Sequence, residues 1–476
     1  EYLALGHIHQ RSRVQRAGQT YYAYSGCLQG AGFDEVGEKG AYLGQWNEGR
    51  LEMAFVRLCG SMCIECELEV TGLETLQQVV NAYEERIGPQ KQHRVKLTLT
   101  GQSQQAWDTA ALERLLQDRA LQIRIADETH KAADTAAIAE TEDGFLMENS
   151  LLRVTVDKQG AITQIIDKRN GLPLMTPGQK MNDWRLYENV EVVYDAWEMS
   201  RDWKKRRQDD AVRASCRMQQ KSDGEQYLSV SYTFGGSSAG MIISLVDDRI
   251  EIEGDVNWQE RRKLLKVHFA SNVLCDDALH EIQFGHVKRP CHDSHAFAAD
   301  RYESCSNRWT AMCEANRGFA ILQSGSRGVS TDRGEIALSL LRAPLVPDDT
   351  ADRGVHSFSY AIMPFAAGFK DAGVVKAGME FAEPGRRDAG FRMDSDAIIL
   401  ETIKPADDGA DDIILRLYES LRTYATGVLH LPFAAKVYES AMDESETGVL
   451  LGEGTAIPLT MRPFEIRTLR LVRTNR

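Results

Sequence analysis

The sequence lacks the features that would assign it to a membrane, to secretion or to nucleic acid. No apolar run among its 476 residues approaches the roughly 20 residues of a membrane-spanning helix. The first residues do not form a basic stretch followed by an apolar core, so no secretory signal is indicated. Positive charge is in deficit, because 56 Lys and Arg stand against 70 Asp and Glu, which gives a net charge of −14. This balance disfavours nucleic-acid binding, which needs a basic surface.

Cysteine is scarce, and the chain has no initiating methionine. The nine cysteines are an odd, scattered set, which predicts reduced thiols and a cytoplasmic protein. The chain starts at Glu1 and opens in the middle of a β pattern, so we expect a fragment. Its length predicts two to four domains.

Two histidines follow the first predicted strand. Tyr2 and Ala4 have the pattern of a strand end, Gly6 turns the chain, and His7 and His9 come next. Two imidazoles at positions i and i+2 on such a loop can reach one metal centre or two adjacent ones. The alternative is a loop whose histidines have only a structural role.

A small α/β segment is predicted over residues 56–130. Apolar residues at helical spacing indicate helices over 71–86 and 107–119, and residues 95–99 alternate as a strand between them. Cys63 and Cys66 fall on opposite faces of one alternating strand, which argues against a thiolate metal site. The small, polar residues 131–143 predict a linker or a fusion junction.

Residues 144–476 have the pattern of a large antiparallel β protein. Alternating residues on both sides of Lys158-Gln159-Gly160 indicate a hairpin, and Asn170-Gly171 indicates a further turn. Many short strands at regular spacing predict a β-sandwich. Further strands are predicted at 227–234, 241–245, 250–256 and 264–269.

Three places in this region offer groups suited to a saccharide. Asp195 and Trp197 combine a carboxylate that accepts from hydroxyl groups with a ring that stacks on sugar C–H surfaces; the alternative is a core tryptophan beside solvated acids. Arg342 ends an apolar strand, either as a satisfied charge or as a donor fork facing a cleft. His292 lies on a polar loop after Pro290, where the chain leaves its sheet. A metal site at His286, Cys291, His292 and His295 is disfavoured because His286 lies in a strand.

Five long motifs stand in this region: FGHVKRPCHDSHAFAADRYE (284–303), NRWTAMCEANRGFAIL (307–322), ALSLLRAP (337–344), LETIKPADDGADDIILRLYE (400–419) and RPFEIRTLRL (462–471). They resemble the C-terminal β region of glycoside hydrolase family 38, the α-mannosidases. The resemblance implies a mutarotase-like antiparallel β-supersandwich at 144–390 and a small β-sandwich at 391–476. It implies a mannose-containing saccharide as ligand and Arg342 as a substrate-side residue. It also implies that the family's zinc ligands and catalytic carboxylates lie in an N-terminal barrel outside this chain.

The first 130 residues resemble a different family. GHIH and YSGCLQGAGFDEVGEKGAYLG (24–44) are similar to the end of the metallophosphoesterase domain in SbcD-type DNA repair exonucleases. The resemblance implies that residues 1–55 end such a domain, that 56–130 form its capping domain, and that His7 and His9 are ligands for manganese. Two histidines cannot hold a dinuclear centre, so a nuclease remnant is expected.

The leading hypothesis is a mainly β chain: the non-catalytic C-terminal part of an α-mannosidase joined to an exonuclease tail. A metal-dependent exonuclease subunit and a plain carbohydrate-binding module remain as alternatives. The join is either natural or the product of a mis-joined reading frame. If the first hypothesis holds, Arg342, Asp195, Trp197 and His292 should meet at one rim of the supersandwich.

Overall fold

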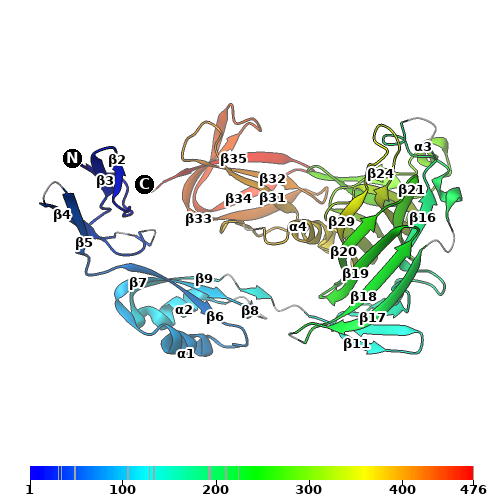
Figure 1. The fold of residues 1–476 in the computed structure, drawn as a ribbon, viewed down its shortest axis with the longest axis horizontal. Helices are drawn as coiled ribbons and strands as arrows, with labels where there is room; N and C mark the ends of the chain where they lie inside the picture. The colour runs from blue at the N-terminus through cyan, green and yellow to red at the C-terminus, as the bar shows by residue number, and fades with distance from the viewer. Residues whose placement is uncertain are drawn as a thin grey trace. The chain divides into compact units, whose positions relative to one another are not determined.

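The computed structural model of the chain divides into two compact units, Glu1–Ala133 and Asp134–Arg476 (Figure 1). The residues described are 1–30, 32–33, 35–47, 50–103, 107–127, 129–131, 134–190, 194–208, 212–222, 224–386 and 388–474.

The first unit opens with two small β elements. Strand β1 pairs in parallel with β3, which also pairs with β2, and β4 and β5 form an antiparallel hairpin. These strands are β1 (Tyr2–Leu5), β2 (Gln15–Ala17), β3 (Thr20–Tyr24), β4 (Gly40–Asn47) and β5 (Arg50–Arg57).

The rest of this unit is a parallel α/β fold, as predicted, with more strands than expected. The sheet order is β6-β7-β9, and β8 pairs with β10. Helix α1 begins at Leu76, later than expected, because Thr75 and Gln78 form a capping box at its start. The elements are β6 (Cys63–Glu69), α1 (Leu76–Arg86), β7 (Gln90–Thr100), β8 (Gln102–Ser103), α2 (Thr109–Leu116), β9 (Ala120–Asp127) and β10 (His130–Lys131).

The expected linker at 131–143 is wrong for its second half. Residues Ala137–Glu140 form strand β11, which pairs antiparallel with β12. Ile138 is buried in the core of the second unit. The short apolar–polar alternation of Ala137-Ile138-Ala139-Glu140 is sufficient for a strand once a neighbouring strand supplies hydrogen bonds.

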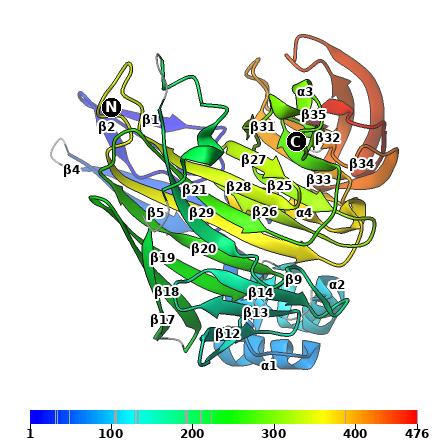
Figure 2. The same ribbon diagram turned by 90° about the vertical axis from the view of Figure 1, so that its right-hand side faces the viewer.

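A large two-sheet sandwich dominates the second unit, and Figure 2 shows its strands most fully. In the described part of the chain one sheet has ten strands, in the order β11-β12-β13-β14-β16-β21-β28-β27-β24 with β15 beside β14. They are β11 (Ala137–Glu140), β12 (Gly144–Glu148), β13 (Leu152–Asp157), β14 (Ile162–Asp167), β15 (Leu172–Pro173), β16 (Met181–Glu188), β21 (Lys263–Ala270), β24 (Ser304–Cys305), β27 (Gly328–Asp332) and β28 (Glu335–Arg342).

The facing sheet has nine strands within the described residues, in the order β17-β18-β19-β20-β29-β26-β25-β22-β23. They are β17 (Arg213–Gln220), β18 (Gln226–Phe234), β19 (Ser237–Val246), β20 (Arg249–Trp258), β22 (Asp277–Ile282), β23 (Gly285–Pro290), β25 (Trp309–Cys313), β26 (Gly318–Gln323) and β29 (Gly354–Phe365). Pro290 ends the edge strand β23, as expected for a residue without an N–H.

Alternation along the strands explains this sandwich. In β19 every second residue is buried, and its inward residues join inward residues of β13, β14 and β21 in one apolar core. The predicted hairpin at 152–167 is confirmed by the pairing of β13 with β14. The predicted mainly β sandwich fold is therefore confirmed.

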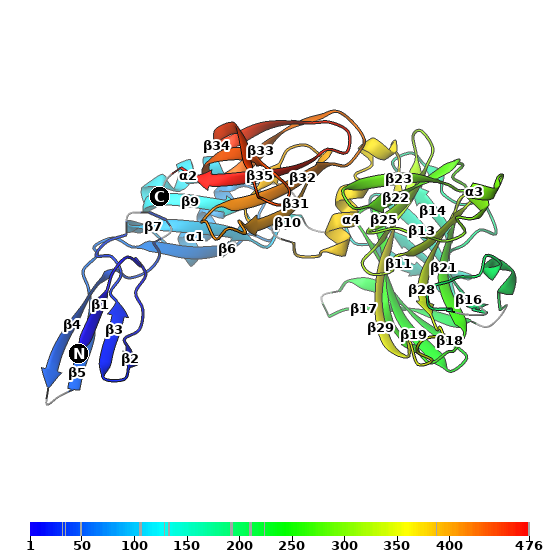
Figure 3. The ribbon, with the colours of Figure 1, turned by 90° about the horizontal axis from the view of Figure 1, so that it is seen from above.

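A smaller sandwich closes the second unit, and α4 (Val374–Ala382) lies between it and the large sandwich (Figure 3). Val374 and Val375 of α4 share an apolar cluster with Trp309, Ile399 and Tyr418, so α4 joins the two β structures. The strands are β30 (Arg392–Met393), β31 (Ile398–Pro405), β32 (Ile413–Glu419), β33 (Ala425–Ser440), β34 (Thr447–Met461) and β35 (Ile466–Arg473).

No helix in the described ranges is both long and apolar enough to cross a membrane.

Candidate functional site

A cavity of about 620 Å³ opens on the outer face of the ten-stranded sheet. Strands β21, β27 and β28 contribute to its floor, and two loops form its walls. One wall comes from the loop after β16, and the other from the segment between α3 (Ala296–Ala299) and β24. The lining residues are Trp197, Glu198, Met199, Leu264, Asp300, Tyr302, Glu303, Gly328, Ser339 and Arg342.

The structure places Trp197, but not Asp195, at this cavity. The side chain of Trp197 is 68% exposed and lines the cavity, so its ring is available for stacking. Asp195 is buried, and its two carboxylate oxygens accept hydrogen bonds from the backbone N–H groups of Leu345 and Val346 at 2.7 and 2.8 Å. Asp195 does not line the cavity; it fixes the chain just after β28.

Arg342 lines the cavity from the end of β28. Its Nε donates to Oδ1 of the buried Asn189 at 3.2 Å, and its backbone N–H donates to Asp352 at 3.3 Å. The contact with Asn189 holds the guanidinium at the cavity wall, and the contact with Asp352 fixes the backbone at the end of β28. Trp197 and Arg342, which are far apart in sequence, therefore meet at one cavity.

His292 is not part of this cavity. It lies in the loop before α3, where its Nδ1 is 2.8 Å from Oγ of Ser294. The cavity is reached instead by Asp300, directly after α3. The segment that follows the polar loop therefore lines the cavity, whereas His292 does not.

The cavity floor holds a charge cluster that sequence reasoning missed. Lys266 has no exposed surface, and its Nζ donates to both carboxylate oxygens of Glu303 at 3.1 and 2.8 Å and to Ser339 Oγ at 2.8 Å. The Ser339 hydroxyl in turn donates to Glu303 Oε1 at 2.5 Å. Burial lowers the pKa of Lys266, while the charge of Glu303 opposes that shift.

Behind this floor lies a second buried group. His268 Nε2 is 2.9 Å from the Tyr187 hydroxyl, and its Nδ1 is 2.9 Å from Glu335 Oε1. Burial lowers the pKa of His268 to about 4, although Glu335 opposes the shift. His268 is therefore neutral in the folded protein at physiological pH, and the ring of Trp203 packs beside it.

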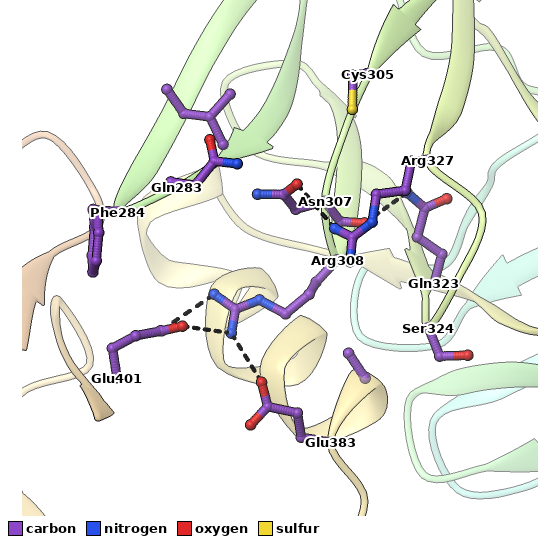
Figure 4. Close-up of a pocket in the computed structure, with 12 residues that line it drawn as sticks. Gln283, Phe284, Cys305, Asn307, Arg308, Gln323, Ser324, Arg327, Glu383 and Glu401 are labelled. Carbon is purple, nitrogen blue, oxygen red and sulfur yellow. Dashed lines mark hydrogen bonds and ion pairs between the residues drawn. The ribbon is translucent and has the colours of Figure 1, made fainter. Parts of the chain in front are cut away.

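A further cavity, of about 590 Å³, lies where the two sandwiches of the second unit meet (Figure 4). Arg308, just before β25, binds the buried Glu281 through Nε at 2.9 Å and NH2 at 2.8 Å. Figure 4 shows the same guanidinium pointing toward Glu401 of β31, at 3.4 Å, and Glu383, at 3.6 Å. Arg308 thus connects three segments and has a clear structural role.

In the first unit, one of the two predicted metal-binding histidines has suitable neighbours. Among the described residues, one group of three His, Cys, Asp or Glu side chains has its ligand atoms within 4.8 Å of one another: His9, Cys27 and Glu35. His9 Nδ1 contacts Glu35 Oε1 directly. His7 is exposed and is not a member of this group.

The comparisons with known proteins assign the class of the second unit. Residues 147–350 match the model of the glycosyl hydrolases family 38 C-terminal domain, and residues 397–469 match that of the family 38 C-terminal beta sandwich domain. The second unit therefore carries the C-terminal domains of glycosyl hydrolase family 38, and the resemblance of this region is confirmed. Neither matched range includes residues 1–133, whose resemblance to repair exonucleases stays a prediction.

Individual relatives agree with this class. Alpha-mannosidase 2C1 of Mus musculus is 30% identical over 354 residues, which cover 70% of this chain and 34% of the relative. Alpha-mannosidase G of Dictyostelium discoideum is 28% identical over 358 residues, or 69% of this chain and 32% of the relative. The chain thus spans about a third of the length of these relatives.

A solved structure shows the same fold. An alpha-mannosidase from Enterococcus faecalis V583 superposes with a TM-score of 0.57 at 13% identity, covering 72% of this chain and 44% of that one. At this identity the similarity supports the fold alone.

Proposed function

We propose that residues 134–476 are the non-catalytic C-terminal part of an α-mannosidase and that the cavity at Trp197 binds a mannose-containing saccharide. The observation that carries this proposal is that Trp197 and Arg342 line one cavity. A stacking face and a rigid fork of N–H donors are complementary to the two kinds of surface that a pyranose offers. The choice of mannose as the sugar rests on the relatives, which are named alpha-mannosidases.

The catalytic groups of such an enzyme are proposed to lie outside this chain. Retaining glycosidases need two carboxyl groups about 5 Å apart. The resemblance places these carboxyl groups and the zinc ligands in an N-terminal barrel. In the described residues of 134–476 no three His, Cys, Asp or Glu side chains are grouped closely enough for a metal, so no step is assigned to zinc here.

The test is saccharide binding by the whole chain and its variants. Methyl α-mannoside is expected to bind with millimolar affinity, about −4 kcal/mol, because half a site offers few contacts. Arg342→Ala and Trp197→Ala are each expected to weaken binding about fivefold or more, since each removes one recognition element. Titration followed by ligand-observed NMR measures this. His292→Gln is the control and should bind normally. Equal affinity in all four proteins would contradict the proposal.

The purified wild-type chain is expected not to hydrolyse an aryl α-mannoside, because the catalytic groups are proposed to lie outside it. Turnover that depends on zinc and survives purification controls would show that catalytic groups are present in this chain.

For the first unit we propose binding of one divalent metal by His9, Cys27 and Glu35. The group offers nitrogen, sulfur and oxygen ligands, a set that suits zinc better than the manganese implied by the resemblance. Competition with a chromophoric zinc indicator is expected to show one zinc per chain. His9→Ala should abolish this binding and His7→Ala should leave it unchanged. If His7→Ala lost zinc binding and His9→Ala kept it, the ligand would be His7 and the proposed site would be wrong.

We further propose a cytoplasmic location, supported by nine cysteines that are all free thiols. The natural or accidental origin of the join between the two units and a nuclease ancestry for residues 1–130 remain hypotheses.

A further inference from the structure

The cavity at Trp197 contains a carboxylate with an unused acceptor position. Ionised Glu303 has about four acceptor positions. Two on Oε1 are taken by Lys266 and Ser339, and one on Oε2 is taken by Lys266. The side chain is 16% exposed and lines the cavity. One position on Oε2 is therefore left for a donor from the cavity.

The buried lysine fixes this carboxylate in place. Lys266 has no exposed surface, and its ammonium also lies 4.6 Å from the ring centre of Trp203. An ammonium in this setting has no water to exchange with, so it holds Glu303 as its counter-ion. Because both groups sit on paired strands or directly beside them, the carboxylate is preorganised before any ligand arrives.

We propose that Glu303 is the specificity-determining residue of the cavity, accepting a hydroxyl group of a neutral saccharide unit and excluding anionic sugars. This rests on the proposed saccharide function. It replaces Asp195, which is committed to backbone contacts, as the carboxylate of the site.

The charges of the lining explain the exclusion. Glu198, Asp300 and Glu303 all line the cavity, and Arg342 is the single cation among the lining residues described. Asp300 is also paired with Arg201 at 3.3 Å, outside the lining. The charge of Lys266 is already paired with Glu303. A uronic acid or a sugar phosphate would bring a further negative charge beside these carboxylates, whereas a neutral hexose brings only hydroxyl donors.

Glu303→Gln is the direct test, measured by NMR titration of the full chain with methyl α-mannoside. Its affinity is expected to fall about tenfold, the size of a lost hydrogen bond to a charged group. Because this variant leaves Lys266 without its counter-ion, its folding must be followed by circular dichroism. A second variant therefore tests the same point without removing a charge.

Gly328→Ala is that second variant. A Cβ at residue 328 would lie 2.9 Å from Glu303 Oε1 and 3.1 Å from Ser339 Cβ, so the carboxylate must shift while the Lys266–Glu303 pair stays intact. The matched control is Gly325→Ala, where a Cβ meets nothing within 4 Å. Gly328→Ala is expected to weaken methyl α-mannoside binding about threefold or more, and Gly325→Ala is expected to bind normally.

Selectivity gives an independent readout. The wild-type chain is expected to bind methyl α-mannoside at least fivefold more tightly than methyl glucuronide, and Glu303→Gln should narrow that ratio. Full affinity and selectivity in Gly328→Ala, with loss of binding in Arg342→Ala, would overturn the role of Glu303 and leave the saccharide function standing. Absence of methyl α-mannoside binding in the wild type, or its insensitivity to Arg342→Ala and Trp197→Ala, would instead overturn the saccharide function itself.

Discussion

Replacing Arg308 with methionine is expected to lower the free energy of unfolding of the second unit by about 3–5 kcal/mol, the cost of breaking a buried ion pair by removing one partner. Arg308 is 15% exposed and its partner Glu281 is 1% exposed. Burial raises the pKa of Glu281 even with Arg308 beside it, so its charge depends on that guanidinium. The urea midpoint, followed by fluorescence of the adjacent buried Trp309, measures the loss.

The double variant Arg308→Met with Glu281→Gln distinguishes the effect of an unpaired charge on Glu281 from the effect of the changed packing at residue 308. Glutamine is neutral and still accepts the backbone N–H of residue 308, which donates to Glu281 at 2.5 Å in the native protein. Most of the lost stability is therefore expected to return. Lys205→Met, which breaks an exposed ion pair with Asp202, should leave the midpoint unchanged. If Arg308→Met shifted the midpoint as little as Lys205→Met, the ion pairs of Arg308 would contribute little to the stability of the second unit.

Acidification from pH 7.5 to pH 5 is expected to destabilise the second unit by about 4 kcal/mol through two buried histidines, about 2 kcal/mol each. Burial lowers the pKa of His268 to about 4 and that of His280 to about 3, from 6.5 in the unfolded chain. The unfolded chain binds a proton at each ring below pH 6.5, whereas the folded chain does not until pH 4 or below. Stability is therefore complete above pH 6.5 and falls as the pH drops. Urea midpoints across this range measure the change.

His280→Leu isolates one of these two contributions. Neither ring nitrogen of His280 has a hydrogen-bond partner among the described residues, so an apolar side chain of similar volume is expected to cost little at pH 7.5. At pH 5 the free energy of unfolding of the variant should exceed that of the wild type by about 2 kcal/mol, because the unfolded variant has no imidazole at residue 280 to take up a proton. If the free energy of unfolding fell equally with pH in His280→Leu and in the wild type, His280 would not contribute to the acid destabilisation.

The sandwich architecture was predictable because its signal is local. Strands β13, β18, β19 and β20 largely alternate between buried and outward residues, and glycine lies in the turns after β13 and β18. Strand β11 was missed because its four residues lie in a polar context and its pairing depends on β12. Helix α1 is shorter than its apolar spacing predicts, because Thr75 caps it and Leu76 is its first residue.

The site was only partly predictable. Arg342 and Trp197 were selected from residue type and resemblance, and the structure brings them to one cavity. Asp195 was selected for the same reason, but sequence cannot distinguish an acid that faces a cavity from one that holds backbone N–H groups. Glu303 carried a weak signal, an acidic residue at the end of a polar loop. Its importance depends on Lys266, which is distant in sequence and looks like an ordinary outward residue of an alternating strand.

Strand β11 also sets where the second unit can safely be cut or joined. The family match begins at residue 147, inside β12 and beyond β11. A chain started there would lose β11 and the first three of the five residues of β12, and would leave the backbone of Thr155, Val156 and Asp157 in β13 without its strand partners. An unpaired, apolar sheet edge is a template for pairing with other copies of the same chain. Recombination or truncation at the homology boundary would therefore produce an aggregating fragment, whereas a start at Asp134 keeps the edge strand that protects the sheet.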